Sequence, residues 1–303
     1  MGIKFLAAVN QEKNRWIYYS LGFLCIITSA WTGVFVSISF MNLIPQISFF
    51  LGKETTTYHS ITAWIGVWVL SEIANFIIST IPFFFLLIGV FIATEWIHQR
   101  KFLTLINPTG FVQWRRLTLG FRVWFFILSL QLCGELLWMP HHFEWSFQPL
   151  QWIVFLPIAL ILTPLQTSTE EVLFRGYFLQ AIKQLIKQPV VLAITTSLPF
   201  VMAHFSNSEM NRGSVWTGLT YGVLSLFLVA VTLKDNRLEL ALGIHAANNL
   251  FILLIANSAD SSLRSPSLLT QVAFAEPQVS FLTTLIGAIV AYVFLFKDDH
   301  NFG

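Results

Sequence analysis

The sequence predicts an all-α, polytopic transmembrane bundle of about eight helices. Of its 303 residues, 55% are hydrophobic and only 11% are charged. A soluble domain would carry about 25% charged residues. The chain also holds 30 Phe and 11 Trp, more than a soluble core requires. These observations exclude an ordinary soluble protein and favour a chain that is largely embedded in lipid.

Eight apolar runs come close to the about 20 residues that a helix needs to cross a bilayer. They lie near 17–44, 71–94, 117–137, 151–180, 190–206, 214–233, 238–257 and 279–296. The first run is far longer than the about 7–15 apolar residues of a signal peptide, so we interpret it as a retained helix. Residues 61–70 are also apolar, and either extend the second helix or lie along the interface. The uneven lengths are typical of helices that tilt, break or carry a site.

Basic residues alternate between the connections. They gather in the two tails and in the second, fourth and sixth connections: Lys4, Lys13, Arg15, Arg100, Lys101, Arg115, Arg116, Lys183, Lys187, Lys234, Arg237 and Lys297. The odd connections hold only Lys53, Arg212 and Arg264. By the positive-inside rule, both termini are expected in the cytoplasm, which requires an even number of helices. The sequence therefore predicts a multi-pass integral membrane protein whose surroundings are membrane lipids.

Other partner classes and motifs are less informative. No basic patch is interleaved with stacking aromatic residues, so a nucleic-acid partner is not expected. The two cysteines, Cys25 and Cys133, fall in apolar runs and are interpreted as small hydrophobic residues. Residues 218–222 form a GxxxG pattern, which permits close helix contact and is expected to pack within the bundle.

A charged cluster interrupts the fourth apolar run. Glu170, Glu171 and Arg175 follow a short polar stretch there. Ionised groups within a bilayer are costly, rare and usually functional. Glu171 and Arg175 are four residues apart, a spacing that suits an ion pair on one helix face. Glu170 points about 100° away from Glu171 and is expected to stay free. The alternative is a helix-end charge cluster at the cytoplasmic surface.

Two histidines recur later in equally apolar surroundings. His204 follows Phe200 by four residues, and His245 precedes Asn249 by four, so imidazole and carboxamide share a face. Asn248 lies off that face and is interpreted as an interhelical contact. Counted from the cytoplasmic helix ends at about 1.5 Å per residue, the carboxylate and both imidazoles lie roughly 10–20 Å deep. We therefore expect them to meet in one water-accessible chamber.

These residues support two chemistries. In one, Glu170 acts as a general base on water, His204 helps to hold that water, and His245 with Asn249 stabilises the developing oxyanion. In the other, Glu170, His204 and His245 bind zinc, which acidifies a bound water. The sequence contains no HExxH motif, the usual spacing in zinc proteases. The residues alone leave both open.

The ordered motifs resemble those of the CPBP family, the CAAX protease and bacteriocin-processing (ABI) family. The resemblance rests on Glu170-Glu171 with Arg175, on Phe200 with His204, and on His245 with Asn249. It covers residues 151–257 as a catalytic core. Residues 1–150 carry no recognised motif, and 258–303 form an outer loop and a last helix.

The resemblance implies an intramembrane endopeptidase with eight helices and a cavity open to the cytosol. It assigns Glu170 to water activation, His204 to water positioning, and His245 with Asn249 to the oxyanion. Glu171, Arg175 and Phe200 inherit supporting roles. It favours a glutamate mechanism without a cofactor, with zinc as the variant, and a membrane-associated or prenylated-type peptide substrate.

Three alternatives to this function remain open from the sequence. The polar cluster could hold helices together in a non-catalytic scaffold or an immunity-type binding protein. The same hydrolase could depend on zinc. A Glu and His proton relay would suit a transporter, but no internal symmetry of the kind found in transporters is visible.

Overall fold

The computed structural model describes residues 16–54, 61–274 and 276–297, with side chains for 16–43, 72–274 and 276–297. All eight predicted spans are helical in these ranges, which confirms the all-α class. They correspond to α2 (Trp16–Glu54), α3 (Ile61–Ile92), α4 (Trp114–Trp138), α5 (Pro149–Glu171), α7 (Pro189–Ala203), α8 (Ser214–Asp235), α9 (Glu239–Leu254) and α10 (Pro277–Phe296). Residues 61–70 belong to α3, so they extend the second helix.

Six helical stretches are long and apolar enough to cross a membrane, among the described residues. The other two, α7 and α9, have 15 and 16 residues. The sequence predicts the short fifth run but not the short seventh one. The long fourth run is not one α-helix. It passes from α5 into a π-helix at Val172–Phe178 and then into α6 (Leu179–Ile182).

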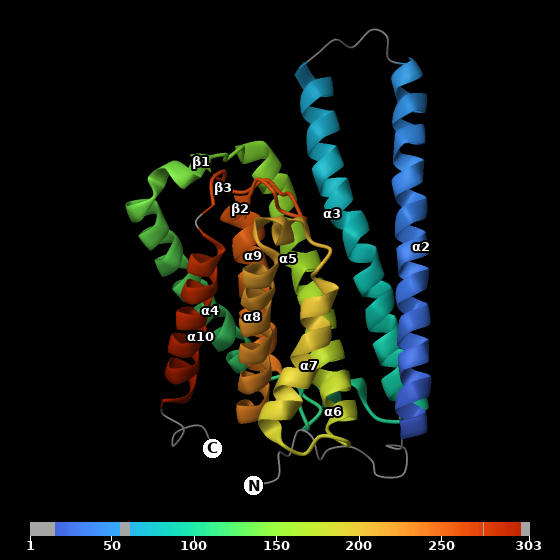
Figure 1. Cartoon of the computed structure of the whole chain (residues 1–303). Helices are drawn as coiled ribbons and strands as arrows, with labels where there is room; N and C mark the ends of the chain where they lie inside the picture. The colour runs from blue at the N-terminus through green and yellow to red at the C-terminus, as the bar shows by residue number, and fades with distance from the viewer. Residues whose placement is uncertain (1–15, 55–60, 275, 298–303) are drawn as a thin grey trace.

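The connections lie alternately at two ends of the bundle (Figure 1). One end carries residues 93–113, 183–188 and 236–238, and we call it the basic end because these connections are rich in Lys and Arg. The other, here the sheet end, carries 139–148, 204–213 and 255–274, with a small sheet of strand order β1-β3-β2. Its strands are β1 (Phe143–Trp145), β2 (Ala256–Ser258) and β3 (Leu269–Gln271). β3 pairs antiparallel with β1 and parallel with β2.

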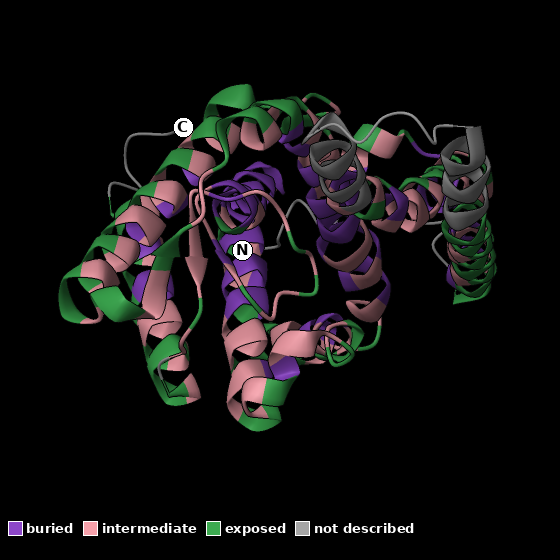
Figure 2. Cartoon of the chain, turned by 90° about the horizontal axis from the view of Figure 1, so that it is seen from above, coloured by how far each residue is buried: buried purple, intermediate pink, exposed green. Residues whose placement is uncertain are grey.

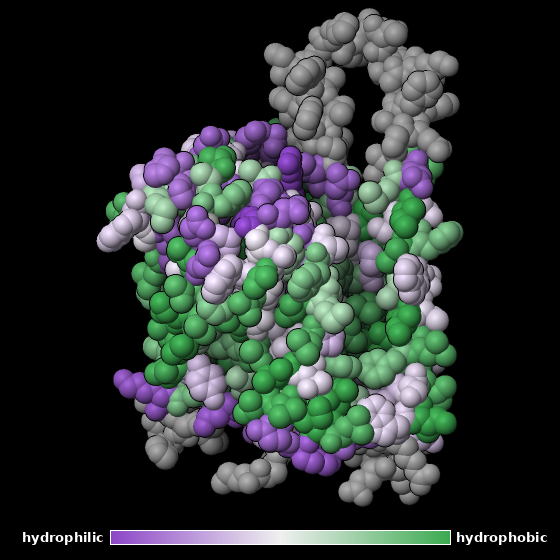
Figure 3. Space-filling model, in the orientation of Figure 1, coloured by the Kyte–Doolittle hydropathy of each residue, from purple (hydrophilic) through white to green (hydrophobic). Residues whose placement is uncertain are grey.

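The surface matches a bundle that sits across a bilayer. Apolar residues form a band between two hydrophilic ends (Figure 3). Buried residues gather in the interior of the bundle, and exposed residues cover its outer faces (Figure 2). Helix α9 is buried along almost its whole length, which places it at the centre of the packing.

Helices α4 and α9 touch backbone to backbone. A Cβ added to Gly243 would lie 2.8 Å from the backbone nitrogen of Phe121 and closer still to the carbonyl oxygen of Leu117. Gly120 is equally tight against the backbone of Leu240. By contrast, the two glycines of the GxxxG pattern in α8 have only ordinary van der Waals contacts, with Phe205 and Val201. That pattern therefore packs within the bundle, as predicted, but it is not the closest helix contact.

We expect Gly243→Ala to destabilise the bundle, because the new methyl group must push α4 and α9 apart. Overpacking of this kind typically costs about 1–3 kcal/mol, and a backbone neighbour cannot rotate away. The matched control is Gly134→Ala in α4, where nothing lies within 4 Å of the added Cβ. Thermal unfolding in detergent compares the two. An unfolding midpoint for Gly243→Ala that equals that of the control would contradict the packing argument.

Candidate active site

The two adjacent glutamates lie at the C-terminal end of α5, where the helix widens into the π-helix. Glu171 and Arg175 are fully buried, and Glu170 keeps 6% of its surface. Arg175 Nη1 donates to Glu171 Oε1 at 2.8 Å. The predicted ion pair is therefore present, and the alternative of a surface charge cluster is wrong.

Arg175 is held by two further contacts from neighbouring helices. Its Nη2 donates to Ser225 Oγ in α8 at 2.8 Å. Its guanidinium lies over the Phe200 ring of α7, 4.4 Å from the ring centroid, in a cation–π contact. These contacts compensate the cost of a buried cation, which needs both a partner charge and hydrogen bonds.

His245 in α9 lies between the two glutamates. Its Nδ1 is 2.7 Å from Glu171 Oε1, and its Nε2 is 3.5 Å from Glu170 Oε2. Because an ionised carboxylate only accepts, Nδ1 is the protonated donor. Glu170 Oε2 accepts no hydrogen bond from the described residues. The contact of His245 with Glu171 was not predicted, since the sequence reasoning paired His245 with Asn249.

His204 lies at the C-terminal end of α7, half-buried. Its Nδ1 is 2.7 Å from the carbonyl oxygen of Phe200. A carbonyl oxygen can only accept, so Nδ1 carries the proton and the neutral ring presents Nε2 as an acceptor. The Phe200 ring contacts both imidazoles, with centroids 4.5 Å from His204 and 5.9 Å from His245. Phe200 thus spaces the two histidines and supports Arg175.

A cavity of about 130 Å³ brings most of these groups together. Phe200, His204, His245 and Asn249 line it, whereas Glu170 does not line it and lies 3.5 Å from Nε2 of His245. A polar cavity of this size holds several waters. The two imidazoles therefore share one cavity, as expected, whereas the Glu170 carboxylate contacts His245 without lining that cavity.

The neighbouring asparagines differ in their contacts. Asn248 Oδ1 accepts from Trp124 Nε1 of α4 at 3.2 Å, the interhelical role predicted for it. Asn248 also donates to Asn249 Oδ1 at 3.1 Å. That bond orients the Asn249 carboxamide and leaves its NH₂ group as the donor side.

Two site residues on α8 were missed by the sequence reasoning. Tyr221 stacks on His204 with ring centroids 4.7 Å apart and lines the cavity. Ser225 binds Arg175. They are four residues apart and so share one face of an apolar helix. Two polar side chains on one face of an apolar helix are the feature of the sequence that could have predicted that this face lines the site.

The zinc ligand set does not assemble. No group of three His, Cys, Asp or Glu side chains that could hold a metal ion occurs within residues 16–43, 72–274 and 276–297. A catalytic zinc site needs about three protein ligands around one point. Glu170 and His245 are in contact, but His204 does not form a group with them that could hold a metal ion. Glu170, His204 and His245 therefore do not form a three-ligand group in the described part of the chain.

The fold and the site define a class: polytopic membrane proteins with a buried Glu-Glu, Arg and His centre. Residues 149–251 match the family described as type II CAAX prenyl endopeptidase Rce1-like. "Uncharacterized protein YyaK" of Bacillus subtilis (strain 168) is 34% identical over 230 residues, covering 75% of this chain and 77% of the relative. No solved structure matches the chain.

The chain belongs to this Rce1-like family, and the predicted resemblance to CPBP proteases is confirmed. It is accordingly a multi-pass integral membrane protein of the CAAX-protease type.

Proposed function

We propose that this protein is an intramembrane endopeptidase that hydrolyses a peptide bond of a membrane-associated substrate, using water activated by Glu170. One observation carries the proposal. Glu170 Oε2 lies 3.5 Å from Nε2 of His245, and His245 lines a cavity together with His204 and Asn249. A base thus lies directly behind a cavity that also carries a water-holding acceptor and an amide donor.

As a general base on water, Glu170 acts in its ionised form. Glu171 and Arg175 form one neutral pair. If His245 is protonated on both nitrogens, it forms a second neutral set with Glu170. A four-charge cluster with no net charge leaves no buried charge uncompensated, and an uncompensated charge is the strongly destabilising case. Glu171 then acts as a positioning residue, because its bond to Nδ1 fixes the ring so that Nε2–H faces Glu170 and the cavity.

The reaction follows from these positions. Water held by His204 Nε2 loses a proton to Glu170, and its oxygen adds to the carbonyl carbon of the substrate. The oxyanion accepts hydrogen bonds from the Asn249 amide and His245 Nε2–H. The C–N bond then breaks, and Glu170 returns its proton to the leaving amine. Each step uses groups of this chain, so the proposed mechanism is metal-independent.

The experiment incubates purified protein with solubilised membrane proteins and identifies new N-termini by mass spectrometry. We expect new termini only when the protein is present, and we expect them to persist with 1,10-phenanthroline, because no step uses a metal. Metal analysis of the same sample should give far less than one zinc per chain. Loss of the new termini with chelator, restored by zinc, would contradict the mechanism. No new termini at all would favour the scaffold alternative.

A further inference from the structure

The candidate active-site cavity opens at the sheet end. Its lining includes Asn207 and Glu209 from the connection after α7, and Ser261, Ser262 and Leu263 from the connection after α9. Both connections lie at the end opposite to the start of α2 and the end of α10 (Figure 1). Cytoplasmic termini and a cavity open to the cytosol, both expected from the sequence, are therefore incompatible. Either the termini or the mouth of the cavity faces the cytoplasm, but not both.

The distribution of basic residues favours keeping the termini in the cytoplasm. The basic end carries Arg100, Lys101, Arg115, Arg116, Lys183, Lys187, Lys234, Arg237 and Lys297 among the described residues. The sheet end carries Arg212 and Arg264. An asymmetry of Lys and Arg in short connections is the main determinant of orientation. The sheet end then faces away from the cytoplasm.

A second cavity of about 310 Å³ adjoins the first at the sheet end. Six residues line both cavities and form a common wall: Glu209, Tyr221, Leu224, Asn248, Ile252 and Ser261. The remaining lining combines polar residues, namely Arg212, Thr217, Thr220, Ser258, Gln271, Ser280 and Thr284, with the apolar Leu128, Ala256, Phe274 and Pro277. The Thr220 hydroxyl donates to the carbonyl oxygen of Trp216 and the Ser258 hydroxyl accepts from Arg212, and each hydroxyl oxygen can accept a further hydrogen bond. A peptide backbone offers those groups donors and acceptors.

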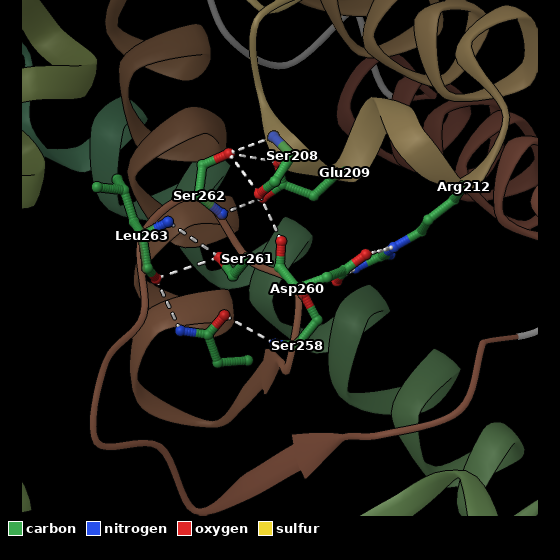
Figure 4. A network of polar contacts seen from close by, with 9 residues as sticks. Ser208, Glu209, Arg212, Ser258, Asp260, Ser261, Ser262 and Leu263 are labelled. Atoms are coloured by element: carbon green, nitrogen blue, oxygen red, sulfur yellow. Dashed lines mark hydrogen bonds and ion pairs between the residues drawn. The ribbon is translucent and has the colours of Figure 1, made fainter.

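The rim of the two cavities is tied together by a polar network (Figure 4). The Glu209 carboxylate accepts from the backbone nitrogen of Ser262 at 3.0 Å and from its hydroxyl at 2.6 Å. Ser208 Oγ donates to the carbonyl oxygen of Asp260 at 2.6 Å. The network joins the connection after α7 to the connection after α9, so the mouth is a fixed structure.

An ion pair completes the rim. Arg212 donates through Nε and Nη2 to the Asp260 carboxylate, with Nε 2.7 Å from Oδ2. This guanidinium holds the pKa of Asp260 below its usual range, so the pair is intact at neutral pH. Arg212 also lies over the Phe274 ring, 3.9 Å from its centroid. Arg212 is thus held against the wall of the second cavity.

We propose that the substrate enters from the sheet end, on the side of the membrane away from the cytoplasm. An extended peptide segment then lies in the second cavity, with its scissile bond over His245. This inference rests on the proposed function for the identity of the occupant. The side and route of entry rest on the cavities, the rim and the charge asymmetry, and can be tested without any turnover.

The test places single cysteines in a Cys25→Ala/Cys133→Ala background and adds a membrane-impermeant sulfonated maleimide to intact spheroplasts. Thr220→Cys lies in the wall of the second cavity, about 9 Å below the start of α8. Its matched control is Leu219→Cys, at the preceding residue of the same helix. Leu219 is exposed on the outside of the helix and lines neither cavity. Lys187→Cys reports on the basic end. Ser261→Cys at the rim is a second, conservative probe should Thr220→Cys fold poorly.

Only a thiolate reacts, so a cysteine surrounded by lipid stays unlabelled. We expect Thr220→Cys and Ser261→Cys to be labelled in intact spheroplasts, at least tenfold more than Leu219→Cys. Lys187→Cys should react only after permeabilisation. Labelling of Thr220→Cys and Ser261→Cys only after permeabilisation would overturn the side of entry. Absence of labelling under both conditions would overturn the water-filled route. Neither result depends on cleavage, so failure of the proposed function is separately visible.

Discussion

Glu170→Gln is expected to reduce peptide hydrolysis by about 10²–10⁴-fold, the usual contribution of a positioned general base. The amide has nearly the shape of the carboxylate but cannot take a proton from water. The measurement is the rate at which the new N-termini appear when equal amounts of wild-type and variant protein are added. Wild-type-like turnover by this variant would remove Glu170 from the mechanism.

The control must show that the loss is chemical. Glu170→Gln keeps the Glu171–Arg175 pair and changes only the longer, 3.5 Å contact with His245, so it should lower the unfolding midpoint less than Glu171→Gln does. Glu135→Gln changes a second glutamate within a membrane helix, in α4 and away from the site, and should leave turnover unchanged. A Glu170→Gln protein that unfolds would favour the scaffold alternative, in which the cluster only holds helices together.

Glu171→Gln is expected to affect stability and activity together. It removes the charge that Arg175 and His245 both contact. Breaking a buried ion pair by neutralising one partner leaves an uncompensated charge and typically costs about 3–5 kcal/mol. Thermal or denaturant unfolding in detergent should show the loss. Activity should fall as well, because the ring of His245 loses the carboxylate that orients it.

Two further variants separate charge from shape. Glu144→Gln changes an exposed glutamate of β1 and should alter stability by no more than about 0.5 kcal/mol. The double variant Glu171→Gln/Arg175→Met removes both charges and should recover part of the lost stability, since replacing a whole buried pair is often nearly neutral. It should remain inactive. A double variant less stable than Glu171→Gln alone would contradict the assignment of the loss to an unpaired Arg175.

The helices were predictable because lipid imposes long apolar runs. The ion pair of Glu171 with Arg175 was predictable because four residues fix a shared helix face. The small sheet was not, since its strands of three residues each show no apolar alternation. For this reason the sequence predicts only a loop over residues 257–279, without strands.

The remaining site contacts depend on tertiary packing. His245 meets Glu171 across 74 residues of sequence, and the π-helix that begins at Val172 is not visible in any apolar pattern. Ser225 and Tyr221 likewise become site residues only when α8 packs beside α7. The direction of the cavity required the positions of both connections at the sheet end.

The shortness of α7 has a consequence for the surrounding lipid. Its 15 residues span about 22 Å, against a hydrocarbon thickness of about 30 Å. Its outer face is apolar and exposed, through Val190, Ile194, Leu198 and Met202. Hydrophobic mismatch of this size is relieved when neighbouring lipids compress. The bilayer should therefore be thinnest beside α7, whose last turn leads into His204. A lipid-anchored peptide then travels a shorter distance from the headgroup layer to the catalytic water.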